Sequence, residues 1–257
     1  MTHARLIAYT LLVMCMGDIS AGGQNVALRE PIKCKVEKDR EAADCLTRLK
    51  GLVTRSGDVL RLHLEGGRAK VYISARDACA QDQVDKCVIH LLARFYPWPR
   101  PYFLVGTNYY ECGHFDLVSR RGGSVVEMAT VPELSPGGKY WVSVDQDDEC
   151  DRKYDVAIWS TESDPPALEF KYTATQYENW TVAGWDGDDR IKFKVFVNAS
   201  QGAYDQDAEV VRSATGWRIV LGQRVDSPRP SKRQATPNVM PDAPPATLRM
   251  IEPSNRP

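Results

Sequence analysis

The densest group of side chains that could do chemistry is an acidic run near the middle of the chain. Its carboxylates belong to Asp145, Asp147, Asp148 and Glu149. Carboxylate oxygens at this density suit Ca²⁺, which takes about six to eight oxygen ligands. The run has neither the spacing nor the Gly of an EF-hand loop, so a solvated loop between two strands is the competing interpretation.

Aromatic side chains form a second candidate, for binding rather than for metal coordination. Trp98 stands between two prolines, in a segment that is unsuited to a central strand. Tyr109 and Tyr110 follow in the same aromatic-rich stretch. Because exposed aromatic side chains on rigid loops are good anchors for ligands and protein partners, we expect these three residues to take part in recognition.

No catalytic motif of any specificity is present, and we expect no cofactor. The sequence contains no GxSxG elbow for a serine nucleophile. His114 lies near Cys112 and Asp116, but a thiol–imidazole pair requires a free thiol, and we expect this cysteine to be oxidised. Paired acids for hydrolysis stay open, because the separation of carboxylates in space is invisible in a sequence. The available glutamates are Glu111, Glu127, Glu133 and Glu149.

The N-terminus has the layout of a secretory signal. Arg5 precedes a mostly apolar run, residues 6–16, and small residues follow around Ala21. We expect residues 1–21 to be removed and the protein to be periplasmic or secreted. The apolar run is too short to span a bilayer stably, so the chain is not expected to be transmembrane after cleavage.

An even number of cysteines remains after this cleavage, which in an exported chain indicates disulfides rather than a metal cluster. They are Cys34, Cys45, Cys79, Cys87, Cys112 and Cys150. The histidines show no ligand-like spacing, so we expect no zinc site. Many connectivities are possible. We favour Cys34 with Cys45 and Cys79 with Cys87, because each pair closes a short polar loop, which leaves Cys112 for Cys150.

These residues have to be positioned by a chain of short β-prone runs. About a dozen such runs, separated by turn residues, predict an antiparallel all-β domain over residues 22–222. Residues 37–50 form the only stretch for which we expect a helix, because its apolar side chains share one face. Residues 223–257 are rich in proline and lack aromatic residues, so we expect a disordered tail.

Two segments of similar sequence, Tyr102–Cys112 and Tyr140–Cys150, are typical of stacked sheet units. Equivalent positions on neighbouring units would set the Cα atoms of Cys112 and Cys150 far apart for a disulfide. The runs Ser135–Val144 (SPGGKYWVSV) and Tyr154–Ser160 (YDVAIWS) resemble turns and strands of WD40-like and periplasmic β-propeller blades. The resemblance covers residues 101–197. It implies blade-like meanders, in an incomplete propeller or a curved sandwich, and a recognition scaffold rather than one particular task.

Charge limits the classes of partner. Residues 22–222 carry 26 Lys and Arg against 30 Asp and Glu, and residues 223–257 carry 6 against 3. Neither balance is typical of a nucleic-acid-binding surface. We therefore expect an exported, non-catalytic module that recognises a protein or a cell-envelope component through loops near Trp98 and the acidic run. A hydrolase with a Glu/Asp pair and a secreted enzyme inhibitor are the alternatives.

Overall fold

The computed structural model describes residues 29–37, 40–109, 112–145, 150, 153–175, 177–199 and 202–226. Antiparallel sheets make up most of this part of the chain, and the helices are short. The predicted all-β class is therefore confirmed. The expected signal segment, residues 1–21, and most of the expected tail lie outside the described residues.

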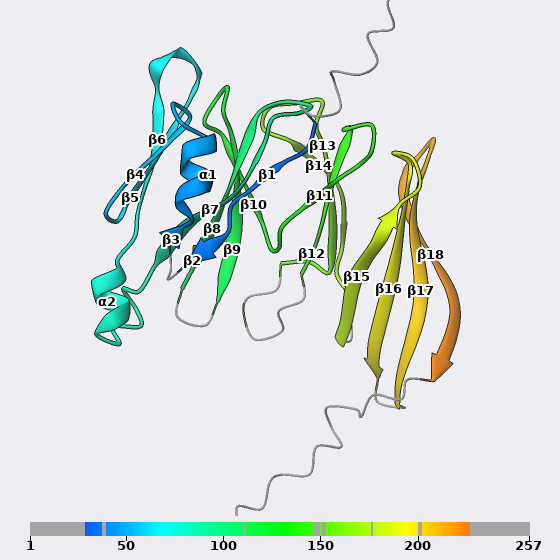
Figure 1. Cartoon of the computed structure of the whole chain (residues 1–257). Helices are drawn as coiled ribbons and strands as arrows, with labels where there is room; N and C mark the ends of the chain where they lie inside the picture. The colour runs from blue at the N-terminus through cyan, green and yellow to red at the C-terminus, as the bar shows by residue number, and fades with distance from the viewer. Residues whose placement is uncertain are drawn as a thin grey trace, which may run out of the picture.

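Four sheets follow one another along the chain (Figure 1). The first consists of β4 (Val53–Ser56), β5 (Val59–His63) and β6 (Ala69–Ile73). The second has the order β1 (Ile32–Lys33), β7 (Ile89–Tyr96), β8 (Tyr102–Asn108), β9 (Gly113–Ser119) and β10 (Val125–Met128). The third contains β11 (Glu133–Leu134), β12 (Tyr140–Val144), β13 (Val156–Ser160) and β14 (Ala167–Tyr172). The fourth contains β15 (Tyr177–Trp185), β16 (Arg190–Ala199), β17 (Gly202–Ser213) and β18 (Gly216–Asp226).

The remaining elements are short. A two-stranded pair is formed by β2 (Val36–Glu37) and β3 (Arg40–Glu41), and the helices are α1 (Ala43–Arg48), α2 (Arg76–Ala80) and the 3₁₀ turn Glu65–Gly67. The helix expected over residues 37–50 is thus present but shorter, and α2 was not expected. A helix as short as α2 is too brief to show a helical period in the sequence. None of the described helices has the length and apolar character needed to span a bilayer.

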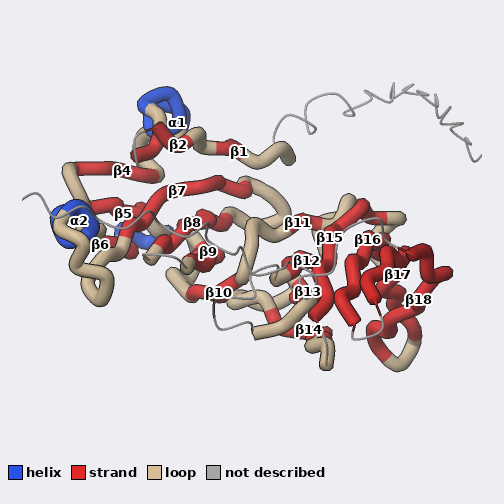
Figure 2. The backbone as a smooth tube through the Cα atoms, turned by 90° about the horizontal axis from the view of Figure 1, so that it is seen from below, coloured by secondary structure: helices blue, strands red, loops and turns tan. Residues whose placement is uncertain are grey.

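The sheets stand face to face in a row, which both backbone views show (Figures 1 and 2). Leu60 and Leu62 of the first sheet share a core with Phe103 of the second. Further buried clusters join the second sheet to the third around Trp141, and the third to the fourth around Trp180. Because the two middle sheets are covered on both faces, strands such as β12 are buried at every position.

The row is open at its ends. Ile73 of the first sheet is 64% exposed, and Lys192 and Lys194 of the fourth sheet face solvent. Each sheet is a meander of mostly consecutive strands, as the blade resemblance implied, but none of the sheets closes into a propeller. The outer sheets keep one polar or solvent-facing side, which is visible in β16 as strict alternation of exposed and buried residues over 190–195.

The three favoured disulfides are present, with Cα–Cα distances of 5.2 Å for Cys34–Cys45, 4.5 Å for Cys79–Cys87 and 5.9 Å for Cys112–Cys150. Cys112 lies just before β9 and Cys150 lies between β12 and β13. The third disulfide therefore connects loops of adjacent sheets. The two cysteines do not hold equivalent strand positions, so their Cα atoms are close enough for a disulfide.

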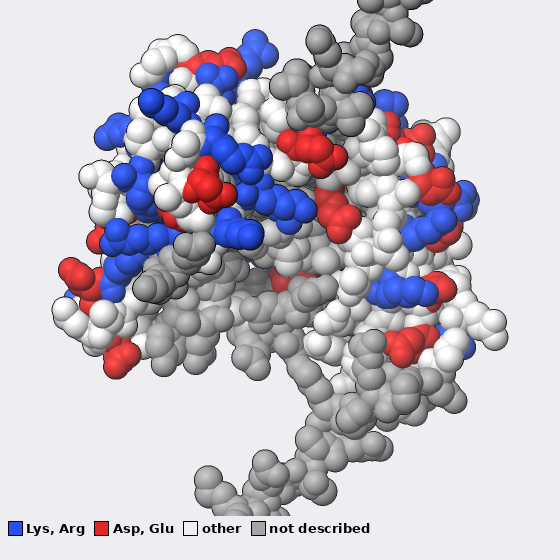
Figure 3. All heavy atoms as spheres, in the orientation of Figure 1, with Lys and Arg blue, Asp and Glu red and all other residues white. Residues whose placement is uncertain are grey.

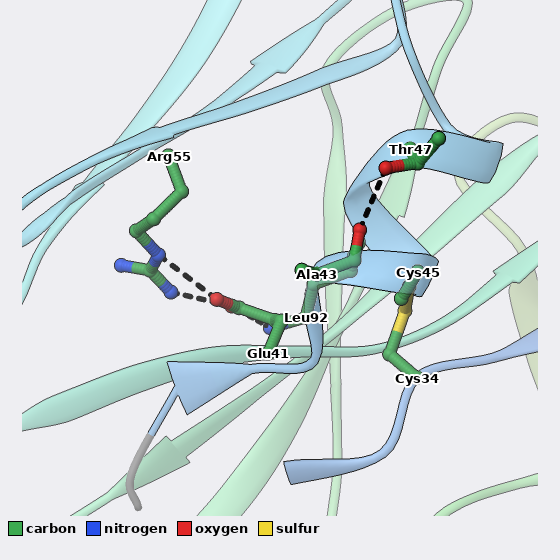
Figure 4. The surroundings of a disulfide bond; sticks show 7 residues. All are labelled: Cys34, Glu41, Ala43, Cys45, Thr47, Arg55 and Leu92. Carbon is green, nitrogen blue, oxygen red and sulfur yellow. Dashed lines mark hydrogen bonds and ion pairs between the residues drawn. A yellow bond between two sulfur atoms is a disulfide. The ribbon is translucent and has the colours of Figure 1, made fainter. Parts of the chain in front are cut away.

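The N-terminal segment, by which we mean the described residues before β4, is fixed by a buried ion pair as well as by a disulfide (Figure 4). The Glu41 side chain is 0% exposed. Its carboxylate accepts hydrogen bonds from Nε and Nη2 of Arg55 in β4. It also accepts the Leu92 backbone N–H at 2.7 Å. Arg55 in turn donates to the carbonyl of His90 at 2.7 Å. The segment that contains Glu41 is thereby tied to the first and second sheets.

The C-terminal boundary of the folded domain differs from the expected one. β18 continues beyond Gly222 to Asp226, because Val225 and Asp226 pair with β17 opposite Asp205 and Tyr204. The composition of the tail, rich in proline from residue 228 onward, gave no indication that its first residues belong to a strand.

Candidate binding site

The predicted recognition residues do not come together. Trp98 lies in the turn between β7 and β8, next to the pair Tyr96 and Tyr102. Tyr109 follows β8 at the other end of the same hairpin, beyond the pair Ile89 and Asn108. Tyr110 lies outside the described residues. A single binding surface that contains both Trp98 and Tyr109 is therefore not supported, because the length of β8 separates them.

The acidic run is described only at its first residue. Asp145 is 7% exposed and follows β12 directly. Its carboxylate accepts the backbone N–H of Lys153 at 3.3 Å, and its own N–H donates to the Asp155 carbonyl at 3.1 Å. Asp147, Asp148 and Glu149 lie outside the described part of the chain. Within that part, no three His, Cys, Asp or Glu side chains are grouped as metal ligands.

A groove of about 450 Å³ surrounds Trp98. Its walls come from residues 29–31 before β1, from Arg94 and Tyr96 of β7, and from residues 132–136 around β11. Both β1 and β11 are edge strands of their sheets. We call this cavity the Trp98 groove. It forms where the second and third sheets meet, so no single stretch of sequence contains it.

The position of Trp98 depends on a close contact with a glycine. A Cβ atom built on Gly138 would lie 2.3 Å from Cη2 of the half-buried Trp98 indole. Gly138 also has a φ of +72°, which L side chains rarely adopt. The guanidinium carbon of Arg29 lies 4.7 Å from the Trp98 ring centroid, a cation–π geometry. The indole is thus held between the β11–β12 turn and the N-terminal segment.

Titratable groups in the groove influence one another. Burial raises the pKa of Glu133, and the nearby Arg94 guanidinium opposes this shift. Burial likewise raises the pKa of Tyr96 to about 12, against an opposing effect of Arg94. The neutral Tyr96 hydroxyl donates to the Pro132 carbonyl at 3.2 Å. A carboxylate that is partly desolvated in this way is stabilised by a ligand that donates hydrogen bonds to it.

A second polar cluster lies on the second sheet, away from Trp98. Asp116 of β9 and Glu127 of β10 are direct cross-strand partners. The His114 ring lies close to both carboxylates, with Nε2 3.3 Å from Oδ1 of Asp116 and Nδ1 3.9 Å from Oε1 of Glu127. The Tyr72 hydroxyl donates to Asp116 at 2.9 Å, and Lys153 pairs with Glu127. Each carboxylate of this cluster therefore has a partner that offsets the repulsion between like charges.

Burial shifts the pKa values of two residues at or near this cluster, Tyr72 and His90. Desolvation is the largest cause of the raised pKa of Tyr72, and the Asp116 carboxylate adds to it. Desolvation also lowers the pKa of His90, whose Nδ1 lies 3.0 Å from the Thr107 hydroxyl. Cys112 is part of a disulfide, so it offers no thiol to His114. The arrangement connects β6, β9 and β10 rather than preparing a nucleophile.

The sequence pattern singled out Trp98 but missed Arg29, which meets it from a distant part of the chain, and Arg94, which precedes it on β7. Glu133 was named only as one of several glutamates. The one available signal was the aromatic and proline-rich stretch itself. The chain matches no protein-family model, and no curated protein and no solved structure is detectably similar to it.

Proposed function

We propose that this protein is an exported, non-catalytic binding module that recognises a protein or a cell-envelope component through the Trp98 groove. The observation that carries the proposal is the meeting of Trp98, Tyr96 and two arginines in one groove between edge strands. Trp, Tyr and Arg are the residues that contribute most to binding energy at protein interfaces. The disulfides support export, because such bonds persist in oxidising compartments.

The groove is also held in shape before any partner arrives. Trp98 packs on Gly138, Tyr96 donates to Pro132, and prolines border both edge strands. A preformed surface loses little conformational entropy on binding. This favours recognition by the groove as it stands, without ordering of a loop.

Affinity capture tests the proposal. The full chain is immobilised and exposed to the envelope fraction of the cells that produce it, beside the variants Trp98→Ser and Ile73→Ser. Ile73 is a matched control, because it is an apolar residue that is 64% exposed on the first sheet. We expect a partner that wild type and Ile73→Ser retain and that Trp98→Ser loses. Circular dichroism and thermal unfolding of each variant establish that it is folded.

Hydrogen exchange of the captured complex gives a readout that does not depend on a substitution. Protection is expected in residues 94–98 and 132–136. Equal recovery of the partner by Trp98→Ser, or protection confined to other segments, would contradict the role of the groove. Absence of any partner of the wild-type chain would contradict the binding function itself.

A hydrolase is the second candidate, and one observation favours it. Glu30 and Glu133 line the same groove, and burial raises the pKa of Glu133, as an acid catalyst requires. Both residues are exposed to water, however, and Arg94 opposes the shift. The binding function therefore fits the groove better. If the protein hydrolyses envelope glycan or peptide and Glu133→Gln loses this activity, the hydrolase becomes the better candidate.

A further inference from the structure

We infer that the partner of the Trp98 groove is an acidic polypeptide, attracted by basic side chains that border the groove. This inference depends on the proposed binding function. Its first support is the distribution of charge along the chain. Residues 29–100 carry 15 Lys and Arg against 10 Asp and Glu, whereas residues 101–226 carry 12 against 21. The formal net charge of −1 conceals this division.

The basic side chains of residues 29–100, the part with the positive balance, are concentrated on one part of the surface (Figure 3). Figure 3 shows Lys and Arg gathered over the part of the surface where Figure 1 places α1, β1 and β7. The exposed basic residues that the structure describes from β1 to the end of α1, which we call the basic rim, are Lys33, Lys35, Arg40 and Arg48. Lys33 is the cross-strand neighbour of Arg94. The rim therefore continues into the groove.

The rim differs from the basic residues of β16 in its lack of ion-pair partners. No member of the rim forms an ion pair with a residue that the structure describes. By contrast, Arg190 pairs with Glu209 at 2.6 Å and Lys194 pairs with Asp207 at 2.5 Å. Positive charge that is not neutralised within the chain raises the local potential and attracts an anionic partner.

Several contacts attach the described residues that carry the rim, 32–37 and 40–48, to the first and second sheets. The disulfide Cys34–Cys45 joins these two ranges, and the Cys34 N–H donates to the Ala93 carbonyl at 2.9 Å. The buried Glu41–Arg55 pair holds the second range (Figure 4). The basic side chains are thus presented from a fixed backbone, which reduces the entropic cost of binding.

The groove itself distinguishes a polypeptide from other polyanions. Glu30 and Glu133 line it together with Arg29 and Arg94. A polymer with a negative charge on every unit, such as a sulfated glycan or a nucleic acid, would meet these carboxylates and be repelled. An acidic polypeptide can carry apolar or aromatic side chains between its carboxylates. It can place these apolar or aromatic side chains beside Trp98 and its carboxylates on the rim.

A random copolymer of glutamate and tyrosine is a suitable probe, and its binding to the full chain is measured at low salt. The double variant Lys33→Glu, Lys35→Glu should weaken the apparent affinity about tenfold or more, because it reverses charge on the rim. The control is Lys171→Glu, Arg218→Glu, which changes net charge equally. Both control residues are exposed and have no ion pair among the described residues. The control should stay within about twofold of wild type, and added salt should weaken wild-type binding.

Three results would overturn the inference. The first is failure of the copolymer to bind the wild-type chain. The second is an equal loss of affinity in the control variant, which would mean that only net charge matters. The third is equal or tighter binding of dextran sulfate or a single-stranded oligonucleotide, which would indicate an unspecific polyanion site. If envelope capture still depends on Trp98 while the rim variant captures normally, the binding function stands and the acidic partner is wrong.

Discussion

At the scale of single residues, the buried pair of Glu41 and Arg55 contributes strongly to the electrostatics of the fold. Their side chains are 0% and 6% exposed. Removal of one partner leaves the other as an uncompensated buried charge, which costs much more than the pair itself contributes. Exposed pairs elsewhere in the chain lack this effect, because water solvates either partner when it is left alone.

The variant Glu41→Gln should therefore lower the free energy of unfolding by about 3–5 kcal/mol. Lys194→Gln is the control, since Lys194 and its partner Asp207 are 70% and 68% exposed. Its expected cost is at most about 1 kcal/mol. Urea unfolding of both variants measures the difference. Similar losses for the two would show that the ion pair is not desolvated as the structure indicates.

At the scale of elements, the turn between β11 and β12 determines the shape of the groove. Gly138 in this turn combines a positive φ with a contact to Trp98, and Gly137 donates its N–H to Asp188 at 2.7 Å. The turn thereby connects the β7–β8 hairpin with the loop that follows β15. Its sequence resembled a propeller-blade turn, but here it supports the groove wall at the boundary of two sheets.

Gly138→Ala should destabilise the protein by more than about 2 kcal/mol, because it adds a collision with Trp98 to the cost of an unfavourable φ. Gly187→Ala measures the cost of an unfavourable φ by itself. Gly187 has a φ of +65°, and no heavy atom lies within 4 Å of the place that a Cβ on this residue would take. It should lose only about 1 kcal/mol. Thermal unfolding compares the two, and an equal loss would disprove the close contact at Trp98.

At the scale of the whole molecule, the sheets form an open row whose neighbours are joined by separate hydrophobic clusters. The Cys112–Cys150 disulfide adds a covalent connection between the second and third sheets, across 38 residues. Cys79–Cys87 closes only 8 residues around α2. Since a disulfide acts mainly on the unfolded chain, the longer closure should contribute more to stability.

Replacement of both cysteines of the Cys112–Cys150 disulfide by serine should lower the free energy of unfolding by about 4 kcal/mol, from the loop-entropy relation. The same change at Cys79 and Cys87 should cost about 2.5 kcal/mol. Urea unfolding of both double variants is the measurement. A smaller loss for the longer closure would mean that it does not restrict the unfolded ensemble in this way.

Local patterns in the sequence were sufficient for the class of fold, and they favoured the three disulfides of the structure among many possible connectivities. The alternation in residues 190–195 specifies a strand with one buried face, and the even number of cysteines after the expected cleavage indicates bridges. These features depend on neighbouring residues or on composition, so they can be read without coordinates. The short helix α2 and the end of β18 escaped, because neither has a local signal of sufficient length.

The sequence by itself determined an all-β chain, indicated that its cysteines are bridged and pointed to Trp98. Only the tertiary structure decided that Trp98 and Tyr109 lie at opposite ends of one hairpin, and that Arg29, Arg94 and Glu133 share a groove with Trp98. The physical reason is that the groove depends on how two sheets stack and which edge strands meet. Stacking is set by contacts between residues that are distant along the chain, which no local period records.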